Sequence, residues 1–102
     1  MILYNITIIV DSDIEIEFRE WARLVYLPQI HRSNLFKSQS FLQMTDSPNE
    51  GTTFCLQMIS ANDEGIESFK KTQLTLFHDQ CKKVWVDKVF IFESKMQYLA
   101  ML

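Results

Sequence analysis

Two pairs of residues in this 102-residue chain have side chains suited to chemistry. His78 and Cys81 are three positions apart, so in a predicted helix they share one face, where an imidazole and a thiol could ligate a metal together. Zinc sites need three or four ligands and no third is visible nearby, so we predict no metal. Asn5, in a predicted strand, and His78 form the second pair. They are two residues on which an enzyme could depend.

Other catalytic signatures are missing from the sequence. It contains no nucleophile elbow and no paired carboxylates, and its 2 glycines exclude a Gly-rich phosphate-binding loop. His31 follows the helix break expected at Pro28, where an imidazolium favours the C-terminal end of the helix dipole. We therefore favour a structural role for His31, a non-enzymatic protein, and no cofactor.

Composition restricts the partners. The net charge of −3, with basic pairs diluted by Glu67 and Asp79, argues against a nucleic-acid binder. The apolar run at residues 2–10 is too short to span a membrane and lacks a signal-peptide layout. Cys55 and Cys81 have no CxxC spacing, which is typical of reduced thiols in a cytoplasmic protein. Residues 1–102 make one domain.

Hydrophobic periodicity predicts four strands and two helices in the order strand, helix, strand, strand, helix, strand. Segments rich in β-branched residues, whose side chains alternate between two faces, indicate the strands. Apolar stripes at spacings of three and four residues indicate the helices. Asp11, Ser12 and Asp13 supply N-cap chemistry for the first helix, and Asn62 or Asp63 caps the second. The predicted strands are 2–10, 36–45, 52–60 and 88–95, and the helices are 14–27, with a further turn to His31, and 63–84. The turn-forming residues 46–51 join the second and third strands.

Each helix has a predicted core stripe, and the second helix has an additional one. In the first helix the stripe is Ile14, Phe18, Trp21 and Val25. In the second helix it is Ile66, Phe69, Gln73, Leu76, Phe77 and Val84. The additional stripe, on the roughly opposite face, is Leu74, His78, Cys81 and Trp85. We predict that it is exposed and contacts the C-terminal tail, a second subunit or another protein.

This element order predicts a ferredoxin-like α+β sandwich with an antiparallel sheet of order 4-1-3-2. Right-handed crossovers place both helices on one face of that sheet. The other face remains uncovered and partly apolar, so we predict a homodimer of the dimeric α/β-barrel type. Its interior would form a ligand pocket whose candidate residues are Leu3, Asn5, Thr7 and His78. The apolar tail, residues 96–102, is expected to dock on the sheet edge or on the partner subunit.

Four motifs are spread over nearly the whole chain, namely the opening ILYNITIIVD, EWARLVYLPQI, Asn34-Leu35-Phe36 and Gly51-Thr52-Thr53-Phe54. Through these motifs the chain resembles the bacterial DUF4286 family. The resemblance implies a dimeric α/β-barrel fold and a small cytosolic protein, and the family carries no established activity. The chain departs from the family pattern at Tyr26, where a histidine is usual, which weakens any chemistry that needs an imidazole there.

Fold-level analogy supplies the alternative of catalysis. Cofactor-independent and haem-degrading monooxygenases of this fold combine an Asn on the first strand with a Trp and a His on the second helix. Asn5 and His78 occupy comparable places here, but Ser68 and Phe69 stand where the Trp is expected. We therefore favour a non-enzymatic homodimer that binds a small apolar or aromatic molecule. Phe18 and Trp21 would anchor its first helix. A monooxygenase or isomerase-like enzyme and a protein-interaction module remain the alternatives.

Overall fold

The computed structural model describes residues 1–48 and 50–102, so Asn49 of the predicted loop lies outside the described residues. Its strands are β1 (Ile2–Val10), β2 (Ser38–Gln43), β3 (Thr52–Ser60) and β4 (Val89–Gln97). The helical segments are η1 (Ser12–Ile14), α1 (Glu15–Trp21), η2 (Ala22–Tyr26), α2 (Leu27–Ser33), α3 (Asp63–Lys71) and α4 (Gln73–Val84). The predicted bounds are confirmed for β1 and β3. The structure shortens β2 and shifts β4 toward the C-terminus.

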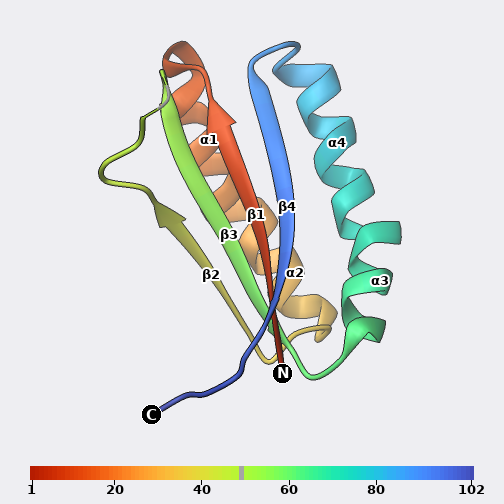
Figure 1. The fold of residues 1–102 in the computed structure, drawn as a ribbon. Coiled ribbons are helices and arrows are strands. Elements are labelled where there is room, and N and C mark those ends of the chain that lie inside the picture. Colours follow the sequence, from red (N-terminus) through yellow and green to blue (C-terminus); the bar gives the residue numbers. More distant parts are fainter. Residues whose placement is uncertain (49) are drawn as a thin grey trace.

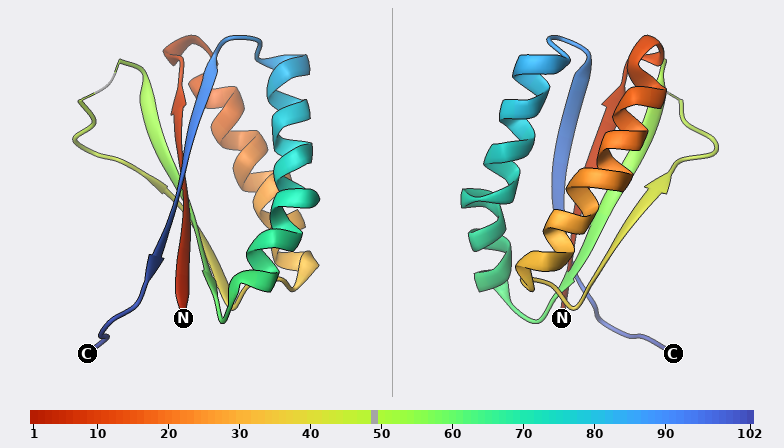
Figure 2. Two further views of the ribbon diagram at one scale, coloured as in Figure 1. Left: turned by 45° about the vertical axis from the view of Figure 1, so that its right-hand side comes forward. Right: turned by 180° about the vertical axis from the view of Figure 1, so that it is seen from behind.

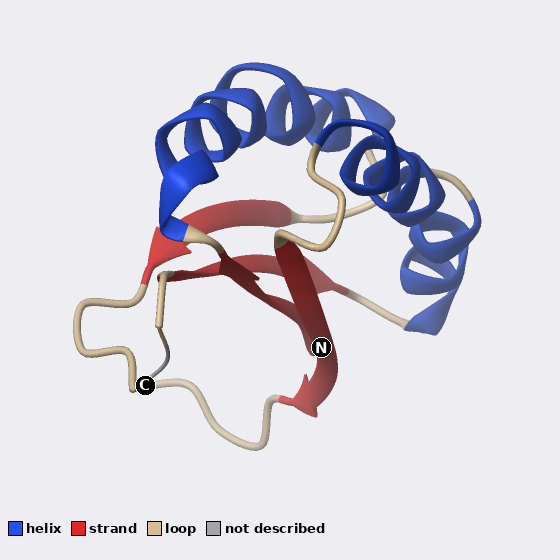
Figure 3. Ribbon diagram, turned by 90° about the horizontal axis from the view of Figure 1, so that it is seen from above, coloured by secondary structure: helices blue, strands red, loops and turns tan. Residues whose placement is uncertain are grey.

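One antiparallel sheet of order β2-β3-β1-β4 forms the platform of the fold, which confirms the predicted 4-1-3-2 order (Figure 1). The central strand β1 pairs along its whole length with both neighbours, so that Ile2 lies opposite Ser60 on one side and Gln97 on the other. All helical segments cover the same face of the sheet (Figures 2 and 3). The architecture is the expected ferredoxin-like sandwich with one uncovered sheet face.

The hydrophobic core lies between the sheet and the helices. Alternate residues of β1 point into it, namely Tyr4, Ile6, Ile8 and Val10, and all four are buried. Aromatic rings fill the space above them. Phe18 lies 5.6 Å from Phe54 and 5.4 Å from Trp85 between ring centroids. Trp21 stacks on Tyr26 at 5.1 Å, so the predicted anchoring of the first helix by Phe18 and Trp21 is confirmed.

The first helix runs from Glu15 to Ser33 and contains a π-helical turn, η2. Its buried residues are Phe18, Ala22, Tyr26 and Ile30, each four positions after the last. An α-helix of 3.6 residues per turn would rotate such a series off the core, and the wider π turn compensates for this rotation. Val25, predicted in the core stripe, is therefore exposed, and that prediction is wrong.

Pro28 does not end the first helix. It has no N–H to donate to the carbonyl of Leu24, and η2 lies directly before it. The helix continues through His31 and ends at Asn34, whose left-handed φ of 57° forms the C-cap.

The predicted second helix is broken at Thr72, between α3 and α4. Thr72 has φ −114° and ψ −77°, and its hydroxyl donates to the carbonyl of Ser68 at 2.8 Å. Because the helix is interrupted here, the residues after Thr72 face other directions than they would in one continuous helix. Leu76 and Val84, predicted in the core, are exposed. Gln73 is half-buried, and its backbone carbonyl accepts a 2.7 Å hydrogen bond from the Tyr26 hydroxyl.

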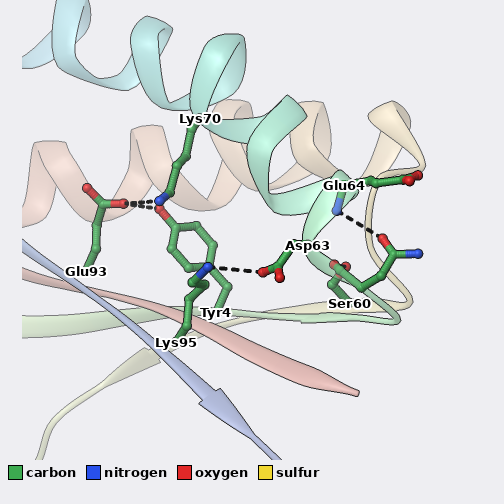
Figure 4. A network of polar contacts seen from close by, with 8 residues as sticks. Tyr4, Ser60, Asp63, Glu64, Lys70, Glu93 and Lys95 are labelled. Carbon is green, nitrogen blue, oxygen red and sulfur yellow. Dashed lines mark hydrogen bonds and ion pairs between the residues drawn. The ribbon is translucent and has the colours of Figure 1, made fainter.

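Polar side chains tie the helix layer to the sheet and cap the helices. Figure 4 shows the Tyr4 hydroxyl donating to Glu93, with Lys70 of α3 3.9 Å from the same carboxylate. Burial and the neighbouring Glu93 raise the pKa of Tyr4, so it remains a neutral donor. The Asn62 side chain accepts from the Glu64 amide at 3.0 Å, which confirms one of the two predicted caps for the second helix.

The C-terminal tail leaves the sheet after β4. The Tyr98 amide donates to the Met1 carbonyl at 3.0 Å, and beyond it Leu99, Met101 and Leu102 are exposed. The tail points toward the side of the sheet opposite the helices (Figures 2 and 3). Of the predicted tail, residues 96–102, Met96 and Gln97 belong to β4 and pair with β1, and the docking predicted for the remaining residues stays a prediction. No helix in the described part of the chain has the length and apolarity needed to cross a bilayer.

Candidate functional site

We define the free face as the side chains of the sheet that point away from the helices. Strand pairing aligns these residues in rows across all four strands. One row is entirely polar, and we call it the polar row: Ser40, Gln57, Asn5 and Ser94. The row on one side of it is Ser38, Ile59, Leu3 and Met96. The row on the other side is Leu42, Cys55, Thr7 and Phe92.

Hydrogen bonds connect the centre of the polar row. Gln57 Nε2 donates to Asn5 Oδ1 at 3.2 Å, and Asn5 Nδ2 donates to Thr7 Oγ1 at 3.0 Å. These bonds fix the side-chain amide of Asn5, a residue that is only 8% exposed. Among the described residues, no protein group pairs with Gln57 Oε1 or with the hydroxyls of Ser40 and Ser94. The row therefore presents both donors and acceptors that are free to bind another molecule.

Large apolar side chains on the free face are left in water. Phe90 and Phe92 of β4 are 60% and 61% exposed, and Leu42 and Met96 are also exposed. The three rows contain no Asp, Glu, Lys or Arg, although these types make up 23% of the chain. An uncharged, largely apolar surface with a polar centre is typical of a surface that another molecule covers.

The structure brings together three of the four candidate pocket residues. Leu3, Asn5 and Thr7 are alternate residues of β1 and lie side by side on the free face. His78 lies on α4, in the layer that covers the other face, and it is exposed. There it borders a shallow hollow of about 280 Å³ together with Cys81 and Trp85. The sheet separates His78 from Asn5, so the two do not form a common site.

The predicted exposed stripe is wrong for two of its four members. Leu74 and Trp85 are 6% and 3% exposed and belong to the core, because the break at Thr72 turns this side of α4 toward the sheet. The Trp85 indole also donates to Glu17 at 3.2 Å, across to α1. Cys81 is half-buried against the core. Only His78 is exposed, so the four residues do not form a docking surface.

Cys81, His31 and Cys55 are the remaining candidate residues, and their surroundings favour structural roles. Burial raises the pKa of the Cys81 thiol to about 11, which keeps it protonated and poorly nucleophilic at neutral pH. In the described part of the chain, no three His, Cys, Asp or Glu side chains converge on a point where a metal could bind.

His31 lies in the last turn of α2, and its Nδ1 is 2.7 Å from Nε2 of Gln39. Cys55 lies on the free face, and both cysteines are free.

Sequence reasoning missed Ser40, Gln57 and Ser94 as members of the site. Each of them alternates with core residues of its own strand. Within one strand, this alternation is only a weak indication that the residue belongs to a site. The stronger signal is positional: all three fall opposite Asn5 or its neighbour once the strand register is fixed. Their alignment with Asn5 becomes visible only when the strand register is known, and one sequence does not specify that register.

Comparison with known proteins identifies the family and the fold. The chain belongs to DUF4286, described as a domain of unknown function, which matches residues 1–99. A crystal structure of an ethyl tert-butyl ether D (EthD) family protein from Bacillus halodurans is similar, with a TM-score of 0.66 at 9% identity. The similarity covers 95% of this chain and 100% of that one. At that identity it supports the fold alone.

A second solved structure is more distant. It is a PII-like signaling protein from Thermus thermophilus, with a TM-score of 0.40 at 14% identity, covering 94% of this chain and 87% of that one. A comparison with curated proteins finds no match.

Proposed function

We propose that this protein is a homodimer that encloses a small apolar or aromatic molecule between the free faces of its two subunits. The observation that carries the proposal is the polar row, which crosses an otherwise largely apolar and uncharged free face. The role proposed is binding rather than catalysis. The bacterial origin and cytoplasmic location expected from the sequence stay predictions.

The exposed aromatic rings favour a second copy as the cover of the free face. Phe90 and Phe92 each leave about three-fifths of their surface in water. Covering that part of one ring, roughly 120 Å², contributes about 3 kcal/mol at 25 cal/mol per Å². A twofold dimer buries both rings from each copy, and an interface of this kind is self-complementary. Charged side chains, which would oppose such a contact, are absent from the three rows.

The polar row favours a ligand-filled interior over a dry one. Covering Gln57 Oε1 and the Ser40 and Ser94 hydroxyls without partners would cost about 1–3 kcal/mol for each group. A small molecule with a polar substituent and an apolar ring satisfies these groups while it packs on the neighbouring apolar rows. Leu3, Asn5 and Thr7 would line the chamber, as expected from the sequence, and Gln57 would join them.

The enzyme alternative has no geometric support from its two named residues. An oxygenase or isomerase-like mechanism built on Asn5 and His78 needs both side chains within reach of one substrate. Asn5 lies on the free face, and His78 lies in the helix layer behind the sheet. The substitution His78→Ala should therefore leave ligand binding unchanged.

Dimer formation is tested by sedimentation equilibrium on a matched pair of variants. Phe92→Asp introduces a carboxylate on the free face, and Leu76→Asp introduces the same group at a residue of similar exposure in the helix layer. We expect Phe92→Asp to weaken the dimer at least about a hundredfold, because a charge would be buried in place of an apolar ring. Leu76→Asp should leave the mass unchanged. A wild-type mass of one chain at all concentrations would refute the proposal.

Ligand binding is tested with p-cresol, an aromatic ring that carries one hydroxyl group, by isothermal titration calorimetry. Gln57→Leu removes the unpaired Oε1 acceptor from the polar row, together with the Nε2 donor to Asn5, and preserves side-chain volume. Gln97→Leu makes the same change at an exposed residue outside the free face. We expect Gln57→Leu to weaken binding about tenfold, as the loss of one hydrogen bond to a buried group predicts, and Gln97→Leu to have no effect. Equal affinities for both variants, or no binding to the wild type, would contradict this site.

A further inference from the structure

The end of the chain, residues 98–102, is an apolar tail, and all of its residues beyond Tyr98 are exposed. Leu99 is 92% exposed, and Met101 and Leu102 are also largely in water. Pairing with β1 ends at Gln97, and the Tyr98 amide makes the last backbone hydrogen bond to the body of the protein. From there the tail projects to the side of the free face (Figures 2 and 3). The tail is thus an apolar extension of β4 that points toward the surface covered in the proposed dimer.

The size of the free face indicates that a dimer needs more contact area than the sheet alone provides. Four strands about 4.8 Å apart and nine residues at about 3.3 Å per residue give a projected face of roughly 19 by 30 Å, or about 570 Å². Stable interfaces bury about 800 Å² per partner. The shortfall, roughly 230 Å², is of the size that a few large apolar side chains supply. The exposed tail holds such side chains in Leu99, Met101 and Leu102.

The tail is also long enough to reach a partner. Its five residues span roughly 17 Å when extended, at about 3.3 Å each. Two sheets packed face to face lie about 10 Å apart, so the tail can cross the gap and lie on the opposite subunit. Met96, the last free-face residue of β4, is itself exposed beside the point of departure. An apolar path thus leads from the free face to the tail.

We infer that in the dimer each tail crosses to the partner subunit and covers an apolar part of the partner's free face. The occupant is a second copy of this chain, and the exchange is reciprocal. The chamber between the subunits is then closed by a segment that the partner supplies. This inference rests on the proposed dimer, and it commits the tail to one of the two positions expected from the sequence.

The first test replaces the apolar side chains while keeping the length of the tail. The variant is Leu99→Ser, Met101→Ser and Leu102→Ser, with Tyr98 and its backbone hydrogen bond preserved. A control variant, Leu24→Ser with Leu76→Ser, removes exposed leucines from the helix layer. We expect the tail variant to raise the dimer dissociation constant about a hundredfold, because both tails lose their buried area, and the control to leave it unchanged. A wild-type dissociation constant for the tail variant would overturn the inference.

The second test separates a tail on the partner from a tail folded over its own subunit. A nitroxide is attached at Met101→Cys in a Cys55→Ser, Cys81→Ser background, and these chains are mixed with nitrogen-15 chains that carry no nitroxide. Broadening of free-face amides in the nitrogen-15 chains shows exchange. A second sample places nitrogen-15 in the nitroxide-bearing chains and mixes them with unlabelled chains. If broadening occurs in this sample but not in the first, the inference is overturned while the dimer still stands. If sedimentation shows only monomers, the proposed dimer fails first, so the two failures are distinguishable.

Discussion

The orientation of α4 determines which of two leucines in this helix is buried, and therefore which one matters for stability. Leu74 is 6% exposed and packs in the core, whereas Leu76, two positions later, is 52% exposed. Leu74→Ala removes a buried isobutyl group and leaves a cavity, which costs about 3 kcal/mol within the usual range of 2–5. Leu76→Ala should cost less than about 1 kcal/mol, because half of that side chain already contacts water. Helix propensity changes equally in both variants and cancels in the comparison.

Urea unfolding followed by circular dichroism at one fixed protein concentration measures this difference. With a denaturant dependence of about 1.3 kcal/mol per molar urea for a domain of this size, Leu74→Ala should lower the midpoint by about 2 M. The midpoint of Leu76→Ala should stay within about 0.7 M of the wild type. A periodic helix running unbroken through Thr72 makes the opposite prediction. If Leu76→Ala proves the more damaging substitution, the broken-helix account is refuted.

Three further substitutions test other parts of the structure. Gly51→Ala should lower the free energy of unfolding by more than about 2 kcal/mol in the same assay, because φ is +79° and a Cβ would lie 2.3 Å from a β1 carbonyl oxygen. Tyr26→Phe should cost about 1–2 kcal/mol in calorimetry by leaving the Gln73 carbonyl without its hydroxyl donor. In a Cys55→Ser background, Cys81 should react with a disulfide reagent at pH 8 about a hundredfold more slowly than an unperturbed thiol, because a pKa of about 11 instead of 9.0 lowers the thiolate fraction. A rate that does not rise with pH between 9 and 11 would contradict that prediction.

The sheet was predictable from the sequence because its signal is local. Each residue of β1 and β3 alternates between two faces, and both strands are bounded by turn or cap residues, so their limits follow from the pattern. The order of the strands follows from the element order and from right-handed crossovers. Antiparallel pairing then leaves one face without helices, which the structure confirms.

The helix phases could not be predicted, because they depend on departures from a regular period. The π-helical turn at Ala22–Tyr26 and the break at Thr72 each shift the residues that follow, and neither leaves a clear mark in the sequence. As a result Val25, Leu76 and Val84 were placed in the core. The same error placed Trp85 on the surface. Tertiary packing of the aromatic rings determines which residues of the two helices face the core.

The candidate site was only half predictable for a related reason. Alternation within β1 placed Leu3, Asn5 and Thr7 together on the free face, as found. Gln57 and Ser94 join Asn5 through pairing across strands that are separated by most of the chain, and one sequence does not specify that register residue by residue.

The central position of β1 has a consequence for how the protein is made. The first of the four strands is flanked by β3 and β4, and Ile2 meets its second neighbour only at Gln97. Until β4 has been synthesised, one side of β1 keeps a row of unsatisfied amides and carbonyls. The sheet can therefore be completed only after β4 is available, and its slow closure depends on contacts between residues far apart in the sequence. Nascent chains halted before Val89 should associate with chaperones and be degraded readily by proteases.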